Sequence, residues 1–225
     1  MTERQKILGR IREALAVEAP FPGRHDVSGK PAPSSSLARD CLPFVGDSVD
    51  EQLAAFRQNA ANLQAHFHLP GSRDEFKMQL IGIRDAGGWK KIATHSGELT
   101  DFALQSIDIP AIKTDSGYDM EELEKCDAGI TECDALIAQT GSVLVTNRSA
   151  GGRALSVLPS HHVVLARRGQ LLRDLPAAFE FLRRKYGANY PSMISFITGP
   201  SRTGDIERIL VLGAHGPREL TIFLL

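Results

Sequence analysis

The chain lacks a long hydrophobic run and an excess of charge of either sign. No stretch approaches the roughly 20 apolar residues of a transmembrane helix, and the amphipathic start MTERQKILGRIREALA has no apolar segment followed by a small-residue cleavage site. Lys and Arg total 26 against 27 for Asp and Glu, a net charge of -1, which disfavours binding to nucleic acid or to an anionic membrane. We therefore expect a cytoplasmic protein that neither binds nucleic acid nor spans a membrane.

Cysteine is scarce as well, and this bears on the cofactors that the chain can hold. The three cysteines, Cys41, Cys126 and Cys133, form no CxxC pair and fall short of the four thiolates that usually hold an iron–sulfur cluster. The histidines gather only in HFH at 66–68 and HH at 161–162, and neither run has a known metal-ligand spacing. No GxGxxG motif follows an expected strand. We expect reduced, structural cysteines, no bound metal and no cofactor.

The first part of the chain has its own pattern. Apolar residues recur at helical spacing from Glu3 to Val17, which predicts an amphipathic helix with one apolar stripe. Proline, glycine and serine dominate residues 20–36, as in a linker. We therefore divide the chain into residues 1–46, a helix followed by a Pro/Ser-rich strap, and residues 47–225, an α/β domain. The apolar stripe either packs on its own domain or docks on a second copy of the chain as a homo-oligomer contact.

The remaining residues alternate between helical and strand patterns. Helices are expected over 47–67 and 72–88, and over MEELEKC and LPAAFEFLRRKYG. Strands are expected over KKIATH, PAIKT, DALIAQ, SVLVTN, HHVVLAR, MISFITG and ERILVLGA, and we expect the last two apolar runs, ERILVLGA and TIFLL, to pair inside the sheet. This alternation predicts an α/β fold with a largely parallel sheet covered by helices, and with a local antiparallel excursion around the turn at 140–142.

Three turns carry groups that suit an anion. Glycine lets backbone N–H groups approach a ligand, and hydroxyl and guanidinium groups donate hydrogen bonds to it. The candidate ligand-binding residues lie in the TGS turn, in GPSRTGD and in the HGP turn: Thr140, Gly141, Ser142, Gly199, Ser201, Arg202, Thr203, Asp205, His215 and Gly216. The same residues also fit plain turns, in which Asp205 caps a helix or holds Arg202 and His215 acts as a hydrogen-bonding strut.

The segments GITECDALIAQTGSVLV, LPSHHVVL and SFITGPSRTGDIERILVLGAHGPRELTIFLL, in this order, resemble the LUD domain and specifically the lactate-utilisation protein C (LutC) family, over about residues 127–225. The resemblance implies a fold like that of the NagB/RpiA/CoA-transferase superfamily, whose loops bind small phosphorylated, nucleotide-bearing or carboxylate ligands. It also implies a part in oxidising L-lactate to pyruvate, as the partner of two iron–sulfur proteins.

Two departures from that family limit what the resemblance carries. Gly204 stands where the family usually has alanine, and Gln139 stands where it often has glutamate. Because an amide cannot form the acyl anhydride that a catalytic glutamate forms in CoA transferases, we carry over no transferase mechanism. Glu132 remains as a nearby carboxylate, which strand alternation could place on either face of the sheet.

Three hypotheses of function remain. The first is a subunit of a lactate oxidation system that acts with iron–sulfur partner proteins and holds a small anionic ligand at the three turns. The second is a stand-alone enzyme on a phosphorylated or carboxylate metabolite, with Asp205, Glu207 or His215 as acid–base candidates. The third is a scaffold without catalytic residues, whose glycines serve only its turns.

Overall fold

The computed structural model describes residues 3–16, 43–203, 211–213 and 215–225. The chain forms two compact units, residues 1–42 and 43–225. In the first unit, helix α1 (Glu3–Ala16) occupies the segment where an amphipathic helix was expected. No helix in the described ranges is both long enough and apolar enough to cross a membrane. The boundary after residue 46 stays a prediction.

A six-stranded parallel sheet forms the centre of the second unit, in the order β1-β12-β7-β4-β2-β3. Its strands are His66–His68 (β1), Ile92–Thr94 (β2), Ala111–Lys113 (β3), Ala128–Glu132 (β4), His161–Ala166 (β7) and Glu219–Leu224 (β12). Each pairing in this sheet is parallel. Nearly every residue of β4, β7 and β12 is buried, as expected for parallel strands that are covered on both faces.

A four-stranded sheet, in the order β8-β5-β6-β9, interrupts the parallel pattern. Its strands are Ala135–Ile137 (β5), Ser142–Thr146 (β6), Leu171–Leu172 (β8) and Ile194–Ile197 (β9). Strand β6 runs antiparallel to both β5 and β9. Gly141 turns the chain between β5 and β6 at φ 65°, in the left-handed region that glycine adopts without a Cβ clash. The expected antiparallel excursion is confirmed.

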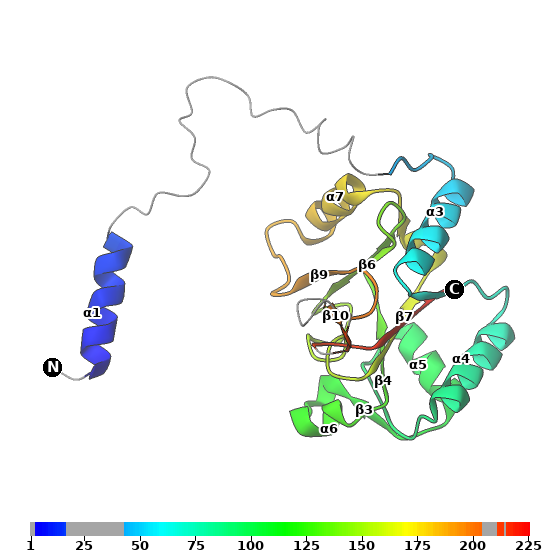
Figure 1. Cartoon of the computed structure of the whole chain (residues 1–225), viewed down its shortest axis with the longest axis horizontal. Coiled ribbons are helices and arrows are strands. Elements are labelled where there is room, and N and C mark those ends of the chain that lie inside the picture. Colours follow the sequence, from blue (N-terminus) through cyan, green and yellow to red (C-terminus); the bar gives the residue numbers. More distant parts are fainter. Residues whose placement is uncertain (1–2, 17–42, 204–210, 214) are drawn as a thin grey trace. The chain divides into compact units, whose positions relative to one another are not determined.

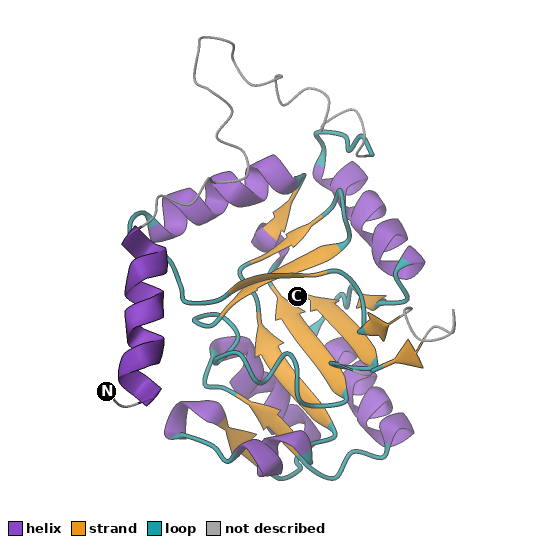
Figure 2. Ribbon diagram, turned by 60° about the vertical axis from the view of Figure 1, so that its left-hand side comes forward, coloured by secondary structure: helices purple, strands orange, loops and turns teal. Residues whose placement is uncertain are grey.

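The helices and the two sheets form layers (Figures 1 and 2). Apolar residues of α4 and α5 pack on one face of the six-stranded sheet. The other face packs against α3 and the four-stranded sheet, whose outer face is covered by α7. The helices are Val49–Asn62 (α3), Arg73–Gly87 (α4), Glu98–Ile107 (α5), Met120–Glu124 (α6) and Leu175–Tyr186 (α7), with single 3-10 turns at Thr114–Ser116 (η1) and Arg168–Gln170 (η2).

Local capping signals place the helix ends that the sequence predicts best. The Ser48 hydroxyl accepts from the Glu51 N–H in a capping box that starts α3. The Ser72 hydroxyl accepts from the Glu75 N–H at 3.1 Å and starts α4. Gly88, at φ 62°, ends α4 in the left-handed conformation. These ends follow from residues next to them in the sequence, so they could be predicted.

One expected helix is shorter than predicted. The pattern indicated a helix over 47–67, but α3 ends at Asn62, Gln64 adopts φ 63°, and the chain enters β1. The Phe67 ring packs edge-on against Phe56 with ring centroids 5.1 Å apart. Phe67 therefore lies in a strand, and its ring packs on a helix residue. This is a tertiary contact that helical periodicity does not predict.

Several elements were not expected, among them β4 and α5, and one expected strand lies elsewhere. The segments 128–132 and 98–107 form strand β4 and helix α5. In the run ERILVLGA, the described residues Val211–Leu212 (β11) pair antiparallel with Arg202–Thr203 (β10), outside the six-stranded sheet, and the other residues of this run except Gly213 lie outside the described ranges. The prediction that both closing runs enter the main sheet is therefore wrong for the described part of ERILVLGA. It is confirmed for TIFLL, which lies in β12 and ends at Leu225.

Histidines occupy β1 and β7 without forming a metal site. Within the described ranges, no group of three or more His, Cys, Asp or Glu side chains could hold a metal ion. The His161 Nε2 atom lies 2.8 Å from Thr221 Oγ1. His162 is buried with its Nε2 atom 2.9 Å from Thr131 Oγ1, and burial lowers its pKa to about 3. These two histidines serve as neutral, hydrogen-bonded groups of the core.

Strand β12 should be indispensable, because it lies between β1 and β7 and buries Phe223. Deleting residues 221–225 should leave the second unit unfolded. Phe223→Ala should lower the free energy of unfolding by about 3–5 kcal/mol in urea titrations, whereas Phe44→Ala, at a ring that is 92% exposed, should change it by less than about 0.5 kcal/mol. A Phe223→Ala variant as stable as the unchanged chain would contradict this assignment.

His162 should make the protein acid-sensitive. Its folded pKa of about 3 lies below the ordinary value of 6.5, so the unfolded chain binds the proton first and stability is lost as the pH falls from about 6.5 toward 3. One such group changes the free energy of unfolding by about 1.4 kcal/mol per pH unit in that window. Urea titrations at several values between pH 7 and pH 5 should show a shallower pH dependence for His162→Gln, and an equal dependence would rule out this role.

Candidate functional site

The TGS turn and the end of β9 meet through hydroxyl groups. Ser142 Oγ donates to Thr140 Oγ1 at 2.8 Å and lies 2.8 Å from Thr198 Oγ1. A Cβ atom on Gly141 would lie 2.7 Å from the backbone nitrogen of Ala60 in α3, so only glycine fits this approach. The structure therefore brings the first predicted turn to the start of the second and packs both near the end of α3.

The second and third predicted turns also contact each other. The Ser201 N–H donates to the Pro217 carbonyl at 2.8 Å, and the Ser201 carbonyl accepts from the Gly213 N–H at 3.0 Å. A Cβ atom on Gly216 would lie 3.2 Å from the Ser201 Cβ atom. The His215 side chain is exposed. The three turns thus form one loop cluster, defined by residues 140–142, 198–203 and 213–217, with Ala214 outside the described ranges.

Arg202 has a protein partner inside this cluster. Its guanidinium Nη2 donates to the carbonyl of Leu63, the residue that ends α3, so the cation faces the negative end of the helix dipole. A Cβ atom on Gly199 would lie 2.8 Å from the same carbonyl oxygen. Asp205 and Glu207 lie outside the described residues, so of the three acid–base candidates only His215 has a described position.

A cavity of about 400 Å³ lies beside the loop cluster, at the amino ends of β1 and β12. Its charged groups are Arg218 and Glu219, and Glu219 Oε2 lies 3.4 Å from His161 Nδ1. The Arg218 N–H is bound to the Ser160 carbonyl at 2.7 Å, while its side chain is exposed. The other lining residues are Ala61, Gln64, Ala65, His66 and Pro200.

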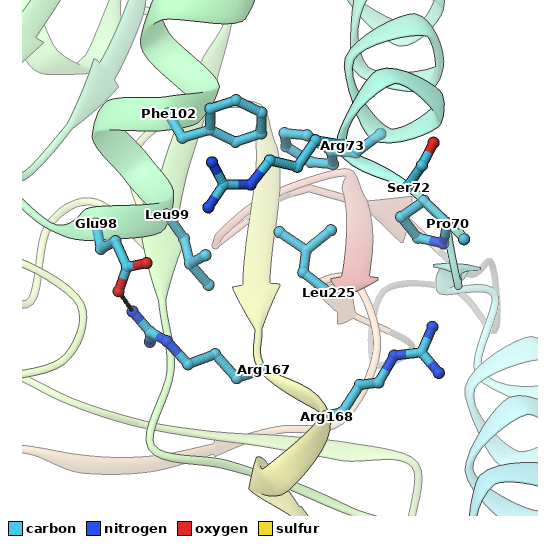
Figure 3. A pocket seen from close by; sticks show the side chains of 11 residues that line it. Pro70, Ser72, Arg73, Glu98, Leu99, Phe102, Arg167, Arg168 and Leu225 are labelled. Carbon is cyan, nitrogen blue, oxygen red and sulfur yellow. Dashed lines mark hydrogen bonds and ion pairs between the residues drawn. The ribbon is translucent and has the colours of Figure 1, made fainter.

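A second cavity, of about 550 Å³, lies at the opposite edge of the sheet, where β1, β7 and β12 end (Figure 3). Ligands of open α/β sheets generally bind outside the carboxyl ends of the strands, which is this edge. We call this space the carboxyl-edge cavity. Its lining residues are Pro70, Gly71, Ser72, Arg73, Phe76, Glu98, Leu99, Phe102, Arg167, Arg168 and Leu225.

One wall of the carboxyl-edge cavity is a closed network of charges. Arg167 donates to Glu132 Oε2 at 2.9 Å and to Glu98 Oε2 at 3.0 Å, and the bond to Glu132 raises the pKa of this guanidinium. The other oxygen of Glu132 accepts from the Leu99 N–H at 2.9 Å. Glu132 thereby caps α5, whose N-cap residue Gly97 has no side chain for that purpose. Glu132 is thus committed to structure.

The two other arginines of this cavity lack such partners. The Arg73 guanidinium lies over the Phe102 ring, 5.1 Å from its centroid. The Arg168 backbone N–H donates to the Leu225 carbonyl at 2.9 Å, and its side chain is exposed. No carboxylate among the described residues pairs with either guanidinium. Figure 3 shows these two groups on opposite sides of the Leu225 side chain.

Sequence reasoning did not single out Arg73, Arg167 or Arg168. They belong to two segments, one after β1 and one after β7, which become neighbours only when β12 pairs with both strands. The signal that could have found them is a general one, namely a charged residue directly after a buried parallel strand. HHVVLARR carries that signal at residues 167–168.

A buried carboxylate elsewhere holds α7 to the four-stranded sheet. Asp134 Oδ1 accepts from Lys185 Nζ and from Tyr186 OH, each at 2.6 Å. Burial alone would raise the pKa of Asp134, but these hydrogen bonds lower it below its ordinary value. The other oxygen, Oδ2, has no partner among the described residues. Because this network joins two layers of the fold, we assign it a structural role.

Comparison with known proteins places the chain in a family. The LUD domain model matches residues 54–225. A lactate utilization protein C from Anoxybacillus flavithermus is 30% identical over 189 residues, which cover 81% of this chain and 84% of that protein. A second one, from Shouchella clausii, is 28% identical over 177 residues, which cover 76% and 77% of the two chains.

The fold has a solved counterpart. The crystal structure of a DUF162 family protein from Deinococcus radiodurans superimposes with a TM-score of 0.60 and 21% identity, over 80% of this chain and 99% of that one. This confirms the expected α/β fold, a mostly parallel sheet flanked by helices. The family match includes the loop cluster and both cavities and reaches further toward the N-terminus than the resemblance seen in the sequence. The chain belongs to the LUD domain family.

Proposed function

We propose that this chain is a subunit of an L-lactate utilisation system that oxidises lactate to pyruvate and acts together with iron–sulfur partner proteins. The observation that carries the proposal is the alignment with proteins named lactate utilization protein C over about four fifths of both chains. An alignment of that extent compares whole proteins and not one shared motif.

Partner proteins are needed because the oxidation of lactate releases electrons. Oxidation of lactate to pyruvate removes two protons and two electrons, so an electron acceptor is required. The chain has three cysteines, fewer than the four thiolates that usually hold an iron–sulfur cluster. Cys126 and Cys133 are buried, and burial raises the pKa of both thiols, which disfavours the thiolate that binds iron. We therefore assign the electron-carrying clusters to the partner proteins.

The loop cluster is our candidate for the small-anion site of this system. It gathers three hydroxyl groups, those of Thr140, Ser142 and Thr198, and it adjoins the 400 Å³ cavity that contains Arg218. Hydroxyl and guanidinium donors are the groups that recognise a small carboxylate or phosphate. In this proposal Arg218 supplies the cation, because Arg202 is engaged at the end of α3.

Deleting the gene should abolish growth on L-lactate as the carbon source while leaving growth on glucose unchanged, and the complete chain should restore it. A tagged copy purified from lactate-grown cells should bring iron and acid-labile sulfide with it, because the partner proteins carry the clusters. After a salt wash the chain should retain less of both. Normal lactate growth of a deletion strain without a second gene of this family would refute the role. Turnover of a phosphorylated or carboxylate metabolite by the purified chain alone would favour a stand-alone enzyme.

Alanine substitutions of Arg202 and Arg218 should distinguish a structural arginine from a ligand-binding one. Arg202→Ala removes the donor at the end of α3 and should lower the free energy of unfolding by about 1–2 kcal/mol. Arg218→Ala should leave stability within about 0.5 kcal/mol and should instead weaken binding of lactate or phosphate, measured by calorimetry. If Arg202→Ala kept full stability but lost anion binding, the recognition role would belong to Arg202.

A further inference from the structure

We propose that the carboxyl-edge cavity binds an organic anion that contains an aromatic ring, at a site separate from the loop cluster. The guanidinium groups of Arg73 and Arg168, which have no acidic partner among the described residues, would hold the anionic groups. Leu99, Phe102 and Leu225 would contact the ring. Each part of this assignment rests on a different property of the cavity: its volume, its charge, its apolar surface and its place on the sheet.

The volume favours a ligand larger than a three-carbon acid. A cavity of about 550 Å³ lies within the range of roughly 300–1,000 Å³ that typically encloses a drug-sized molecule. A three-carbon acid such as lactate would leave most of this space unfilled, so a larger ligand makes fuller use of it.

The charge calls for an anion. Arg167 is bound by two carboxylates, Glu98 and Glu132, and contributes little to attracting a ligand. Arg73 and Arg168 have no acidic partner among the described residues, and the guanidinium fork binds a carboxylate or phosphate through two parallel hydrogen bonds. Three arginines line the cavity, against one acidic side chain, that of Glu98. The side chains that line the cavity thus carry more positive than negative charge.

The apolar surface accounts for the ring. Leu99, Phe102 and Leu225 line the cavity and are half-buried, so part of each side chain meets solvent in the empty cavity. Phe76 lies behind them, fully buried and stacked on Phe102 with ring centroids 5.6 Å apart. A planar ring could cover this patch while Arg73 remains stacked on Phe102, since stacking leaves the N–H edges of a guanidinium available.

The position keeps this site distinct from the loop cluster. Strand β12 (Glu219–Leu224) follows the HGP turn and is itself followed by Leu225, which lines the carboxyl-edge cavity. A strand of six residues spans about 20 Å at roughly 3.3 Å per residue, so the two sites lie at opposite ends of the same strand. Substitutions at one site should not disturb ligand contacts at the other.

Calorimetry on the full chain can test the assignment with four probes. ADP without metal and 2-naphthoate each combine a ring with an anionic group, phosphate in one and carboxylate in the other. Adenosine provides the ring without the charge, and pyrophosphate the charge without the ring. At least one of the two ring-bearing anions should bind at least tenfold more tightly than adenosine and pyrophosphate, and the stronger of the two identifies the anionic group that the site prefers.

Variants should then locate that binding. Arg73→Ala and Arg168→Ala should each weaken it at least tenfold, and Arg168→Lys should weaken it less. Both side chains are exposed and have no acidic partner among the described residues, so neither loss should impair folding. Leu99→Trp should block the ring while both charges remain. Arg184→Ala on α7, whose guanidinium lies 3.8 Å from Glu180, should leave the affinity unchanged.

Two results would overturn the proposal. One is that neither ADP nor 2-naphthoate binds the folded chain with a dissociation constant below about 1 mM, a free energy of roughly -4 kcal/mol. The other is that Arg73→Ala, Arg168→Ala and Leu99→Trp all keep the full affinity. Either result would leave the proposed role in lactate utilisation untouched, because that role is tested by growth of a deletion strain.

Discussion

The parallel pairing of β12 between β1 and β7 is the constraint on which the rest of the structure depends. Thr221 pairs with His66 on one side and with Val163 on the other, so the last strand joins segments from widely separated parts of the sequence. Both faces of the strand are buried, with Phe223 toward α4 and α5 and Ile222 toward α3 and the four-stranded sheet. The layers on either side therefore depend on this strand for their apolar surface.

The direction of the strands then decides what each edge of the sheet can do. Because all pairings in the six-stranded sheet are parallel, every strand begins at one edge and ends at the other. The edge where β12 begins holds the loop cluster, closed by short contacts among its own turns. The opposite edge holds a larger cavity, where Arg73 and Arg168 have no acidic partner among the described residues. The polar turns that stand out in the sequence thus lie at one edge of the sheet. The arginines that only the fold brings together lie at the other edge.

The sequence predicts those parts of the fold that local groups determine. Ser72 and Gly88 mark the ends of α4, and Gly141 marks the turn between β5 and β6. Helix α5 shows the limit. Its N-cap is Gly97, and the carboxylate that accepts from the Leu99 N–H comes from Glu132, at the end of β4. A capping group that comes from a distant part of the sequence leaves no signal in the residues next to the helix. For this reason neither α5 nor the end of β4 could be predicted from a local capping pattern.

The candidate site obeys the same rule, and arginine shows why. Arg202 lies in the richest loop of the sequence, yet its guanidinium is bound to the carbonyl of Leu63 at the end of α3. Arg168 lies in an inconspicuous stretch after β7, and its guanidinium has no acceptor among the described residues. A guanidinium is free to recognise a ligand only when the protein does not already satisfy its donors. Whether its donors are satisfied depends on the acceptors that the fold brings near the guanidinium. Neither the residue type nor the local motif reveals this.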